Sequence, residues 1–147
     1  MKINTTRFGT VEVEPDRLIR FPDGLLGFTG QERFVLFQED PQSHFLWLQS
    51  LDRPELAFVV TDPAGFFPDY EVPLQGEQVQ ELGIREPSDA QILVIVNKRG
   101  HTLSVNLQGP LVVHRRDRVG RQLVLADRRY HTRVPLMQLP ATTAVSA

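Results

Sequence analysis

The stretch Phe45–Thr61, FLWLQSLDRPELAFVVT, decides the fold class of this chain. It holds two apolar and β-branched runs, Phe45–Ser50 and Leu56–Thr61, on either side of a polar segment at Asp52–Glu55. Runs of this length and composition predict β-strands, and the proline and acids between them predict a turn. The stretch therefore predicts two short strands that lie antiparallel to each other.

The same pattern continues in both directions along the chain. Further strands are predicted at Arg33–Phe37, Gln91–Asn97, Thr102–Asn106, Leu111–His114 and Gln122–Leu125. Alternation around Gly9 predicts a hairpin near Arg7–Thr10, and Pro22-Asp23-Gly24 predicts a turn after the short apolar stretch that ends at Phe21. Glu77–Leu82 is the one segment that predicts a helix, with Gly83 as its C-terminal cap.

Many short strands at close spacing are typical of small barrels and sandwiches. We expect a mainly β, single-domain, β-barrel-like fold of short antiparallel strands with one short helix. The 147 residues suit one domain, and 41% apolar with 23% charged residues is a globular balance. We predict the domain over residues 1–137 and a disordered tail over residues 138–147, which are small and polar.

Several classes of protein are disfavoured by what the sequence lacks. It has no cysteine for a disulfide scaffold, no apolar run long enough to span a membrane, and no signal peptide in its first ten residues. We therefore expect a cytoplasmic protein with no membrane contact.

No pattern of residues predicts catalysis, a metal site or a cofactor. The four histidines are far apart, no GxSxG motif is present, and the glycines at 24, 27 and 30 lack the context of a phosphate-binding loop. The carboxylates between Asp52 and Glu71 fit turns, a solvated face or an acidic docking surface better than an acid–base pair. We expect a protein that is not an enzyme.

The formal net charge of −2 conceals an uneven distribution. Residues 1–97 carry 7 basic and 16 acidic side chains, and residues 98–147 carry 9 basic and 2 acidic ones. The Arg-rich segment 115–133 would suit a small nucleic-acid-binding β-barrel. Tyr130 is the only aromatic residue there, and no RNA-binding motif is present, which disfavours that function. Internal pairing with the acids is another explanation.

Three aromatic rings lie close together at Phe66, Phe67 and Tyr70, beside the acids Asp69 and Glu71. Rings surrounded by charges are typical of protein-binding hot spots. Packing in the core is the alternative for each ring, and the sequence leaves both open.

Four segments together resemble the family of flagellar assembly factors called FliW. They are FPDGLLGF at Phe21–Phe28, WLQSLDRPELAFVVTDPAGFFPDYE at Trp47–Glu71, SVNLQGPLVV at Ser104–Val113 and YHTRVPL at Tyr130–Leu136. The resemblance covers roughly residues 2–136 in order. Val134 departs from it, because the family carries histidine there, and Lys98–His101 is a short turn where relatives often carry a longer acidic loop.

The resemblance implies a non-enzymatic β domain that binds the RNA-binding translational repressor CsrA, antagonises its repression of flagellin mRNA and also binds flagellin. Candidate contacts for CsrA are then Phe66, Phe67, Asp69, Tyr70 and Glu71. Asn106 is a weaker candidate, and its alternative role is to cap the turn before Gly109-Pro110. Arg115, Arg116 and Arg118 are candidates for a charged rim that contacts flagellin.

Overall fold

The computed structural model describes residues 1–140, which form eleven strands, one short helix and three short 3-10 turns. The strands are β1 (Lys2–Thr5), β2 (Gly9–Glu12), β3 (Leu18–Arg20), β4 (Arg33–Phe37), β5 (Phe45–Ser50), β6 (Ala57–Thr61), β7 (Ala90–Arg99), β8 (Thr102–Val105), β9 (Leu111–His114), β10 (Gly120–Gln122) and β11 (Val134–Gln138). The helix is α1 (Glu77–Gln80), and the turns are η1 (Pro15–Arg17), η2 (Pro63–Gly65) and η3 (Pro87–Asp89). The predicted fold class, mainly antiparallel β with one short helix, is confirmed.

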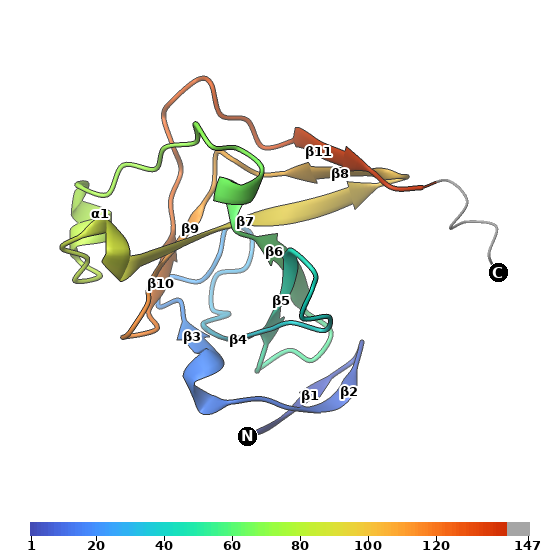
Figure 1. The fold of residues 1–147 in the computed structure, drawn as a ribbon. Coiled ribbons are helices and arrows are strands. Elements are labelled where there is room, and N and C mark those ends of the chain that lie inside the picture. Colours follow the sequence, from blue (N-terminus) through green and yellow to red (C-terminus); the bar gives the residue numbers. More distant parts are fainter. Residues whose placement is uncertain (141–147) are drawn as a thin grey trace.

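Nine strands form one sheet around the long strand β7 (Figure 1). The order is β10-β9-β7-β6-β5-β4-β3, and every strand pair in it is antiparallel. The first half of β7 pairs with β9 and its last residues pair with β8, which in turn pairs with β11. The loop Asn106–Pro110 separates β8 from β9. Strands β1 and β2 form a separate hairpin.

The sheet curls but does not close into a barrel. A single parallel bridge, between Arg20 and Val119, links its β3 edge to the residues before β10. Inside the curl lies a core cluster that includes Phe21, Phe34 and Leu93. A second cluster, on the other side of β7, is covered by the irregular segments that follow η2 and β10. The surface grooves are therefore lined mainly by the irregular segments that cover the second cluster, rather than by the strands of the sheet.

Most predicted elements are confirmed, and three differ. The helix α1 ends at Gln80 with Glu81 as its C-cap, short of the predicted end at Leu82, although Gly83 has the predicted left-handed φ, at +79°. The predicted strand at Gln122–Leu125 begins earlier as β10, because Gly120 already pairs with Val113 of β9. It also ends earlier, because Leu123 and Leu125 donate to carbonyls of the loop before β9, those of Pro110 and Gln108. Strand β11 was not predicted, since proline at position 135 is tolerated only at a sheet edge.

The predicted tail begins inside β11, whose last residue is Gln138, and residues 141–147 lie outside the described part of the chain. Within residues 1–140, no helix is long and apolar enough to cross a membrane.

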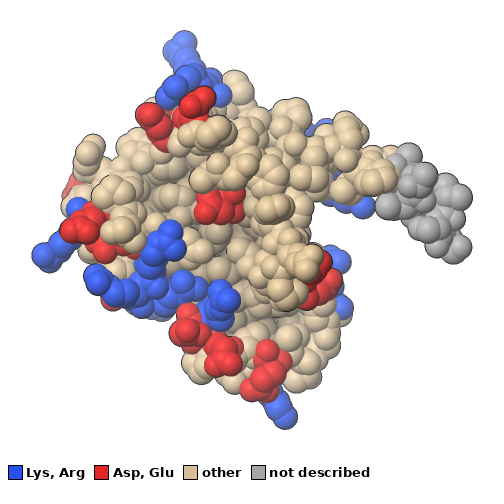
Figure 2. Space-filling view, viewed as in Figure 1, with Lys and Arg blue, Asp and Glu red and all other residues tan. Residues whose placement is uncertain are grey.

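The charge split along the sequence does not appear as two poles on the face shown in Figure 2. Figure 2 shows small acidic groups alternating with basic ones over the face in view, with the largest basic group left of centre. Folding brings arginines of the basic part beside acids of the acidic part, since Arg116 contacts Asp89 and Arg121 contacts both Asp23 and Glu81.

Candidate protein-binding surface

The aromatic segment begins at a turn that the sequence predicts. Asp62 caps η2 by accepting a hydrogen bond from the amide of Ala64 at 2.9 Å. The amides of Phe66 and Phe67 then donate to the carbonyl of Pro63. These bonds end strand β6 and direct the chain away from the sheet and across the second core cluster.

The rings of Phe66, Phe67 and Tyr70 are each partly buried, so each has one part inside the protein and one part at the surface. Phe66 stacks on Phe45 with 6.2 Å between ring centroids. Phe67 and Tyr70 pack against the core cluster that includes Val94 and Leu107. The outer parts of the same three rings line a groove of about 430 Å³. From the sequence, packing in the core and contact with a partner are alternatives for each ring. In the structure, one ring can do both, because Phe67 and Tyr70 pack on the core cluster and also line the groove.

Tyr70 meets Tyr130 at the centre of this surface, edge to face, at 4.7 Å between centroids. The Tyr70 hydroxyl donates to the carbonyl of Leu107 at 2.6 Å, and the Tyr130 hydroxyl accepts from the amide of Glu71 at 3.0 Å. Burial, and to a lesser extent Tyr130, raise the pKa of Tyr70 above its ordinary value. The two hydroxyls thus fix the chain where it passes from the aromatic residues to Glu71.

A second groove, of about 630 Å³, lies beyond this crossing. It is lined by Glu71–Gln75 on one side and by Leu125–Asp127 on the other, and Arg129 borders both grooves. The Arg129 guanidinium lies 5.1 Å from the Tyr130 ring centroid and pairs with Asp127 at 2.7 Å. This contact raises the pKa of Arg129 and lowers that of Asp127. Two adjoining grooves of this kind suit an elongated partner segment with several apolar side chains.

Two of the acids beside the rings are available to a partner. Asp69 and Glu71 are exposed, and neither takes part in an ion pair among residues 1–140. By contrast, Asp52 pairs with Arg33, which lowers the pKa of Asp52, and Glu55 is engaged by Arg53. The acidic character of the segment Asp52–Glu71 is therefore concentrated at its aromatic end.

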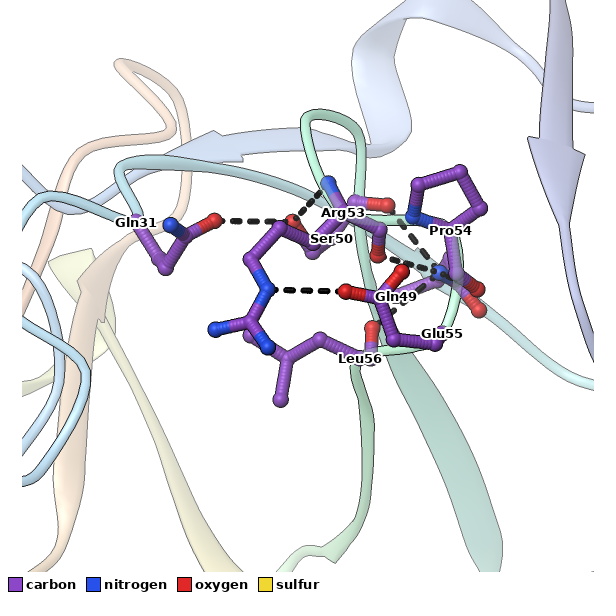
Figure 3. A network of polar contacts seen from close by, with 7 residues as sticks. All are labelled: Gln31, Gln49, Ser50, Arg53, Pro54, Glu55 and Leu56. Atoms are coloured by element: carbon purple, nitrogen blue, oxygen red, sulfur yellow. Dashed lines mark hydrogen bonds and ion pairs between the residues drawn. The ribbon is translucent and has the colours of Figure 1, made fainter.

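The turn that carries Asp52 and Glu55 is built on a buried glutamine (Figure 3). Gln49 is fully buried, and its Nε2 lies 3.0 to 3.1 Å from the carbonyl oxygens of Ser50, Pro54 and Leu56 and 3.5 Å from that of Arg53. Its Oε1 has no hydrogen-bond partner within residues 1–140. The side chain thus holds a turn in which the residues from Asp52 to Glu55 are all exposed.

The three candidate arginines have different surroundings. Arg115 lines a pocket of about 270 Å³ together with Phe67 and Tyr70, so the structure brings it to the aromatic segment. Arg116 pairs with Asp89 at 3.6 Å. The structure does not place Arg116 or Arg118 in the lining of that pocket.

Arg118 is half-buried in the turn between β9 and β10, with a left-handed φ of +56°. Its Nη1 donates to Gln91 at 3.5 Å, while Nε and Nη2 are buried and have no partner in the described part of the chain. Burial and the nearby Arg17 lower the pKa of Arg118. Internal pairing accounts for part of the basic segment, because Arg116, Arg121 and Arg129 all contact carboxylates.

Asn106 makes the contact that its alternative role predicts. Its Oδ1 accepts from the amide of Gly109 at 2.9 Å, which caps the turn before Pro110. A Cβ at Gly109 would lie 2.9 Å from the side-chain nitrogens of both Asn106 and Gln122, so both side chains would have to shift to accept it. Asn106 stands next to Leu107, which lines the first groove.

Sequence reasoning missed Tyr130, Arg129 and His131 as members of this surface, although all three line the first groove. The signal was present, since Tyr130 opens the segment YHTRVPL that carries part of the family resemblance. Over residues 1–140, no cluster of three or more His, Asp or Glu side chains could hold a metal ion.

These features define a small, mainly antiparallel β protein whose grooves lie on irregular segments that cover the sheet. A family model described as FliW protein matches residues 2–136 of the sequence. The chain belongs to the FliW family.

Several known proteins are similar to this chain over most of their length. The flagellar assembly factor FliW of Desulfitobacterium hafniense (strain Y51) is 40% identical over 135 residues, which cover 90% of this chain and 89% of that protein. The protein of the same name from Geotalea uraniireducens (strain Rf4) is 37% identical over 140 residues, covering 94% and 85%. A crystal structure of the flagellar assembly factor FliW matches with a TM-score of 0.83 and 33% identity, covering 93% of this chain and 97% of that one.

Proposed function

We propose that this chain is a flagellar assembly factor without enzymatic activity that binds two protein partners in the cytoplasm. One is the RNA-binding translational repressor CsrA, whose repression of flagellin mRNA the chain antagonises. The other is flagellin, so that flagellin synthesis is coupled to assembly. Membership of the FliW family supports this function, and so do the relatives named flagellar assembly factors.

One observation supports the site assignment most directly. The segment Phe66–Tyr70 lines a groove with partly buried rings, and among residues 1–140 neither Asp69 nor the following Glu71 takes part in an ion pair. An RNA-binding protein must be positively charged where RNA lies, so exposed carboxylates suit two routes of antagonism: they occupy that surface, or they dock beside it and place like charge in the path of the RNA. Charges at an interface mainly accelerate association, whereas buried rings slow dissociation. Phe66, Phe67 and Tyr70 would therefore hold the complex, and Asp69 and Glu71 would attract CsrA.

The test measures CsrA binding to two variants by surface plasmon resonance. Tyr70→Ala should accelerate dissociation, and Glu71→Lys should slow association and reduce its dependence on salt. Glu39→Lys, the same charge change at an exposed position between β4 and β5, should leave both rates unchanged. Because Tyr70→Ala also removes core contacts, Asp69→Lys provides a second variant outside the core. Unchanged CsrA affinity in all folded variants would refute the site assignment.

The flagellin contact is proposed for the rim formed by Arg115, Arg116 and Arg118. The position of Arg115 beside Phe67 and Tyr70 supports it, because an amphipathic flagellin segment needs an apolar groove with a charged edge. A triple alanine variant of the three arginines should retain less flagellin in a pull-down, and normal retention would rule the rim out.

Salt-dependent RNA binding by the isolated protein would instead favour a nucleic-acid-binding barrel that uses residues 115–133.

A further inference from the structure

The end of strand β7 forms, with β8 and β11, a three-stranded arm that extends past β6 (Figure 1). The last pair between β7 and β6 joins Val96 to Val59, and residues 97–99 then pair with β8. A groove of about 540 Å³ lies on this arm, and we call it the arm groove. It shares no lining residue with the two grooves of the aromatic surface or with the pocket of Arg115.

The register across the three strands separates the two faces of the arm. One row consists of valines that belong to the second core cluster or pack against it: Val96, Val105 and Val134. Side chains alternate along a strand, so the neighbouring row lies on the opposite face, and it consists of Asn97, Ser104 and Pro135. Arg99 and Thr102 pair with each other two residues further along and lie on the same face as that row. The arm therefore packs on the core with an apolar face and leaves a polar face outside.

Every charged residue that lines the arm groove is basic, and the three are Lys98, Arg99 and Arg133. All three are exposed, and none takes part in an ion pair among residues 1–140. By register Lys98 belongs to the other face, but it lines the groove as well. Elsewhere, five arginines contact carboxylates: Arg33, Arg53, Arg116, Arg121 and Arg129. The arm groove thus has a positive charge that no acid in its lining neutralises.

The neutral side chains of the groove add hydrogen-bond donors. Gln138 donates through its Nε2 to the Thr102 hydroxyl at 3.0 Å, which leaves the hydroxyl hydrogen of Thr102 free to donate. Ser104 supplies a second hydroxyl on the same face, and Asn97 supplies an amide group. Guanidinium and ammonium groups form strong charge-assisted hydrogen bonds with carboxylates. The arm groove therefore fits a partner that carries several carboxylates.

Nucleic acid is the other polyanion that a basic groove could take, and two features disfavour it. No aromatic residue lines the arm groove, so no base could stack on a ring there. The whole chain has a net charge of −2, whereas nucleic-acid-binding domains are typically strongly basic. An acidic protein segment needs only the local positive charge, and charge complementarity therefore favours it.

We propose that the arm groove is a docking surface for an acidic segment of a protein partner, whose carboxylates contact Lys98, Arg99 and Arg133. This inference goes beyond the proposed function, because it assigns an interface to residues that neither the aromatic surface nor the arginine rim uses.

The experiment uses two fluorescent peptides of about 12 residues, about 40 Å long when extended, as probes. One alternates glutamate with serine, and the other replaces every glutamate with glutamine. Fluorescence anisotropy with the full chain at about 20 mM salt should show binding of the glutamate peptide at least about ten-fold tighter, because three exposed ion pairs form. That affinity should fall as the salt approaches about 0.3 M, since exposed charges are screened. NMR mapping should place the bound peptide at residues 97–104 and 133–135.

Two matched triple variants separate the groove from the overall charge of the chain. The arm variant, Lys98→Gln with Arg99→Gln and Arg133→Gln, should bind the glutamate peptide about ten-fold more weakly. The control variant removes the same charge from three exposed positions elsewhere, each without an ion pair among residues 1–140: Lys2→Gln, Arg20→Gln and Arg85→Gln. It should keep the affinity of the natural chain within about two-fold. Neither measurement uses CsrA or flagellin, so failure here and failure of the proposed function are distinguishable.

Four results would overturn the proposal. Equal binding of the two peptides at low salt would show that the groove does not select carboxylates. An equal loss of affinity in the arm and control variants would show that net charge alone attracts the peptide. Tighter binding of a single-stranded RNA, lost in the arm variant, would make the groove a nucleic-acid site. A concentration-dependent dimer in sedimentation that the arm variant abolishes would assign the groove to a second copy of this chain.

Discussion

Replacing Gln49 with glutamate should make the stability of the protein depend strongly on pH. The Gln49 side chain is fully buried, and its Nε2 donates into a group of backbone carbonyl oxygens (Figure 3). A protonated glutamate has one O–H in place of the two N–H donors, so it loses about one hydrogen bond, worth about 1 kcal/mol. An ionised glutamate has no donor at all and would place a negative charge against those oxygens.

The larger effect comes from ionisation. Burial without a positive partner raises a carboxyl pKa by about three units, and each unit corresponds to about 1.4 kcal/mol. Because the folded-state pKa is raised, the penalty is absent below the unfolded value of about 4.3 and grows as the pH rises to about 7. Gln49→Glu should therefore cost about 1 kcal/mol at low pH and about 5 kcal/mol at neutral pH. That is comparable with the whole stability of many small domains.

Urea denaturation of Gln49→Glu and the natural chain between about pH 4.5 and 8 measures this difference. Gln49→Leu is the matched control. It removes the donors together with the unpartnered Oε1, so its deficit should be about 1 to 2 kcal/mol at every pH. If the free energy of unfolding varied with pH in the same way for the glutamate and leucine variants, the backbone carbonyls around position 49 would not disfavour a negative charge. That result would refute the prediction.

Three further predictions concern single side chains. Arg118→Gly should raise the free energy of unfolding by about 1 kcal/mol in thermal denaturation, because φ of +56° is strained for arginine and two of its buried guanidinium nitrogens lack partners among the described residues 1–140. A lower melting temperature would contradict this. Gly24→Ala should lower the free energy of unfolding by about 2 to 3 kcal/mol in urea denaturation, since its φ is +69° and the added methyl would meet the Phe28 carbonyl. Gly30→Ala is the control: its φ is also left-handed, but the space around it is open, so the loss should be smaller. The natural chain should lose stability as the pH rises above about 10, because the folded-state pKa of Tyr70 is raised. In urea denaturation between about pH 9 and 11, Tyr70→Phe should show a smaller fall in the free energy of unfolding with pH. An identical fall in the two proteins would refute this.

The elements that depend on neighbouring residues were predictable from the sequence. Strand β5 follows the apolar run at Phe45–Ser50, and the left-handed Gly83 follows the helix, because both are set by short-range chemistry. Strand β11 could not be predicted in the same way. Its proline is acceptable only because β11 lies at the edge of the sheet, and edge position is a property of the whole topology.

The aromatic site was only partly predictable. The cluster at Phe66–Tyr70 and the acids beside it are visible in the sequence. That Tyr130 would accept from the amide of Glu71, and that Arg129 would border both grooves, depends on a contact between distant segments. No local pattern marks such a contact. The exposure of Leu26 was equally hidden, because the neighbouring Leu25 has the same chemistry and is buried.

The long strand β7 has a consequence for how the molecule opens. It carries ladders to β6, β8 and β9, so its amide protons can meet solvent only when much of the sheet separates. The hairpin of β1 and β2 pairs only with itself. We expect hydrogen exchange in that hairpin by local opening, with low protection, while β7 exchanges at the rate of global unfolding. The domain should thus melt from its N-terminal ribbon inward, and the β7 ladder should be the last part to open.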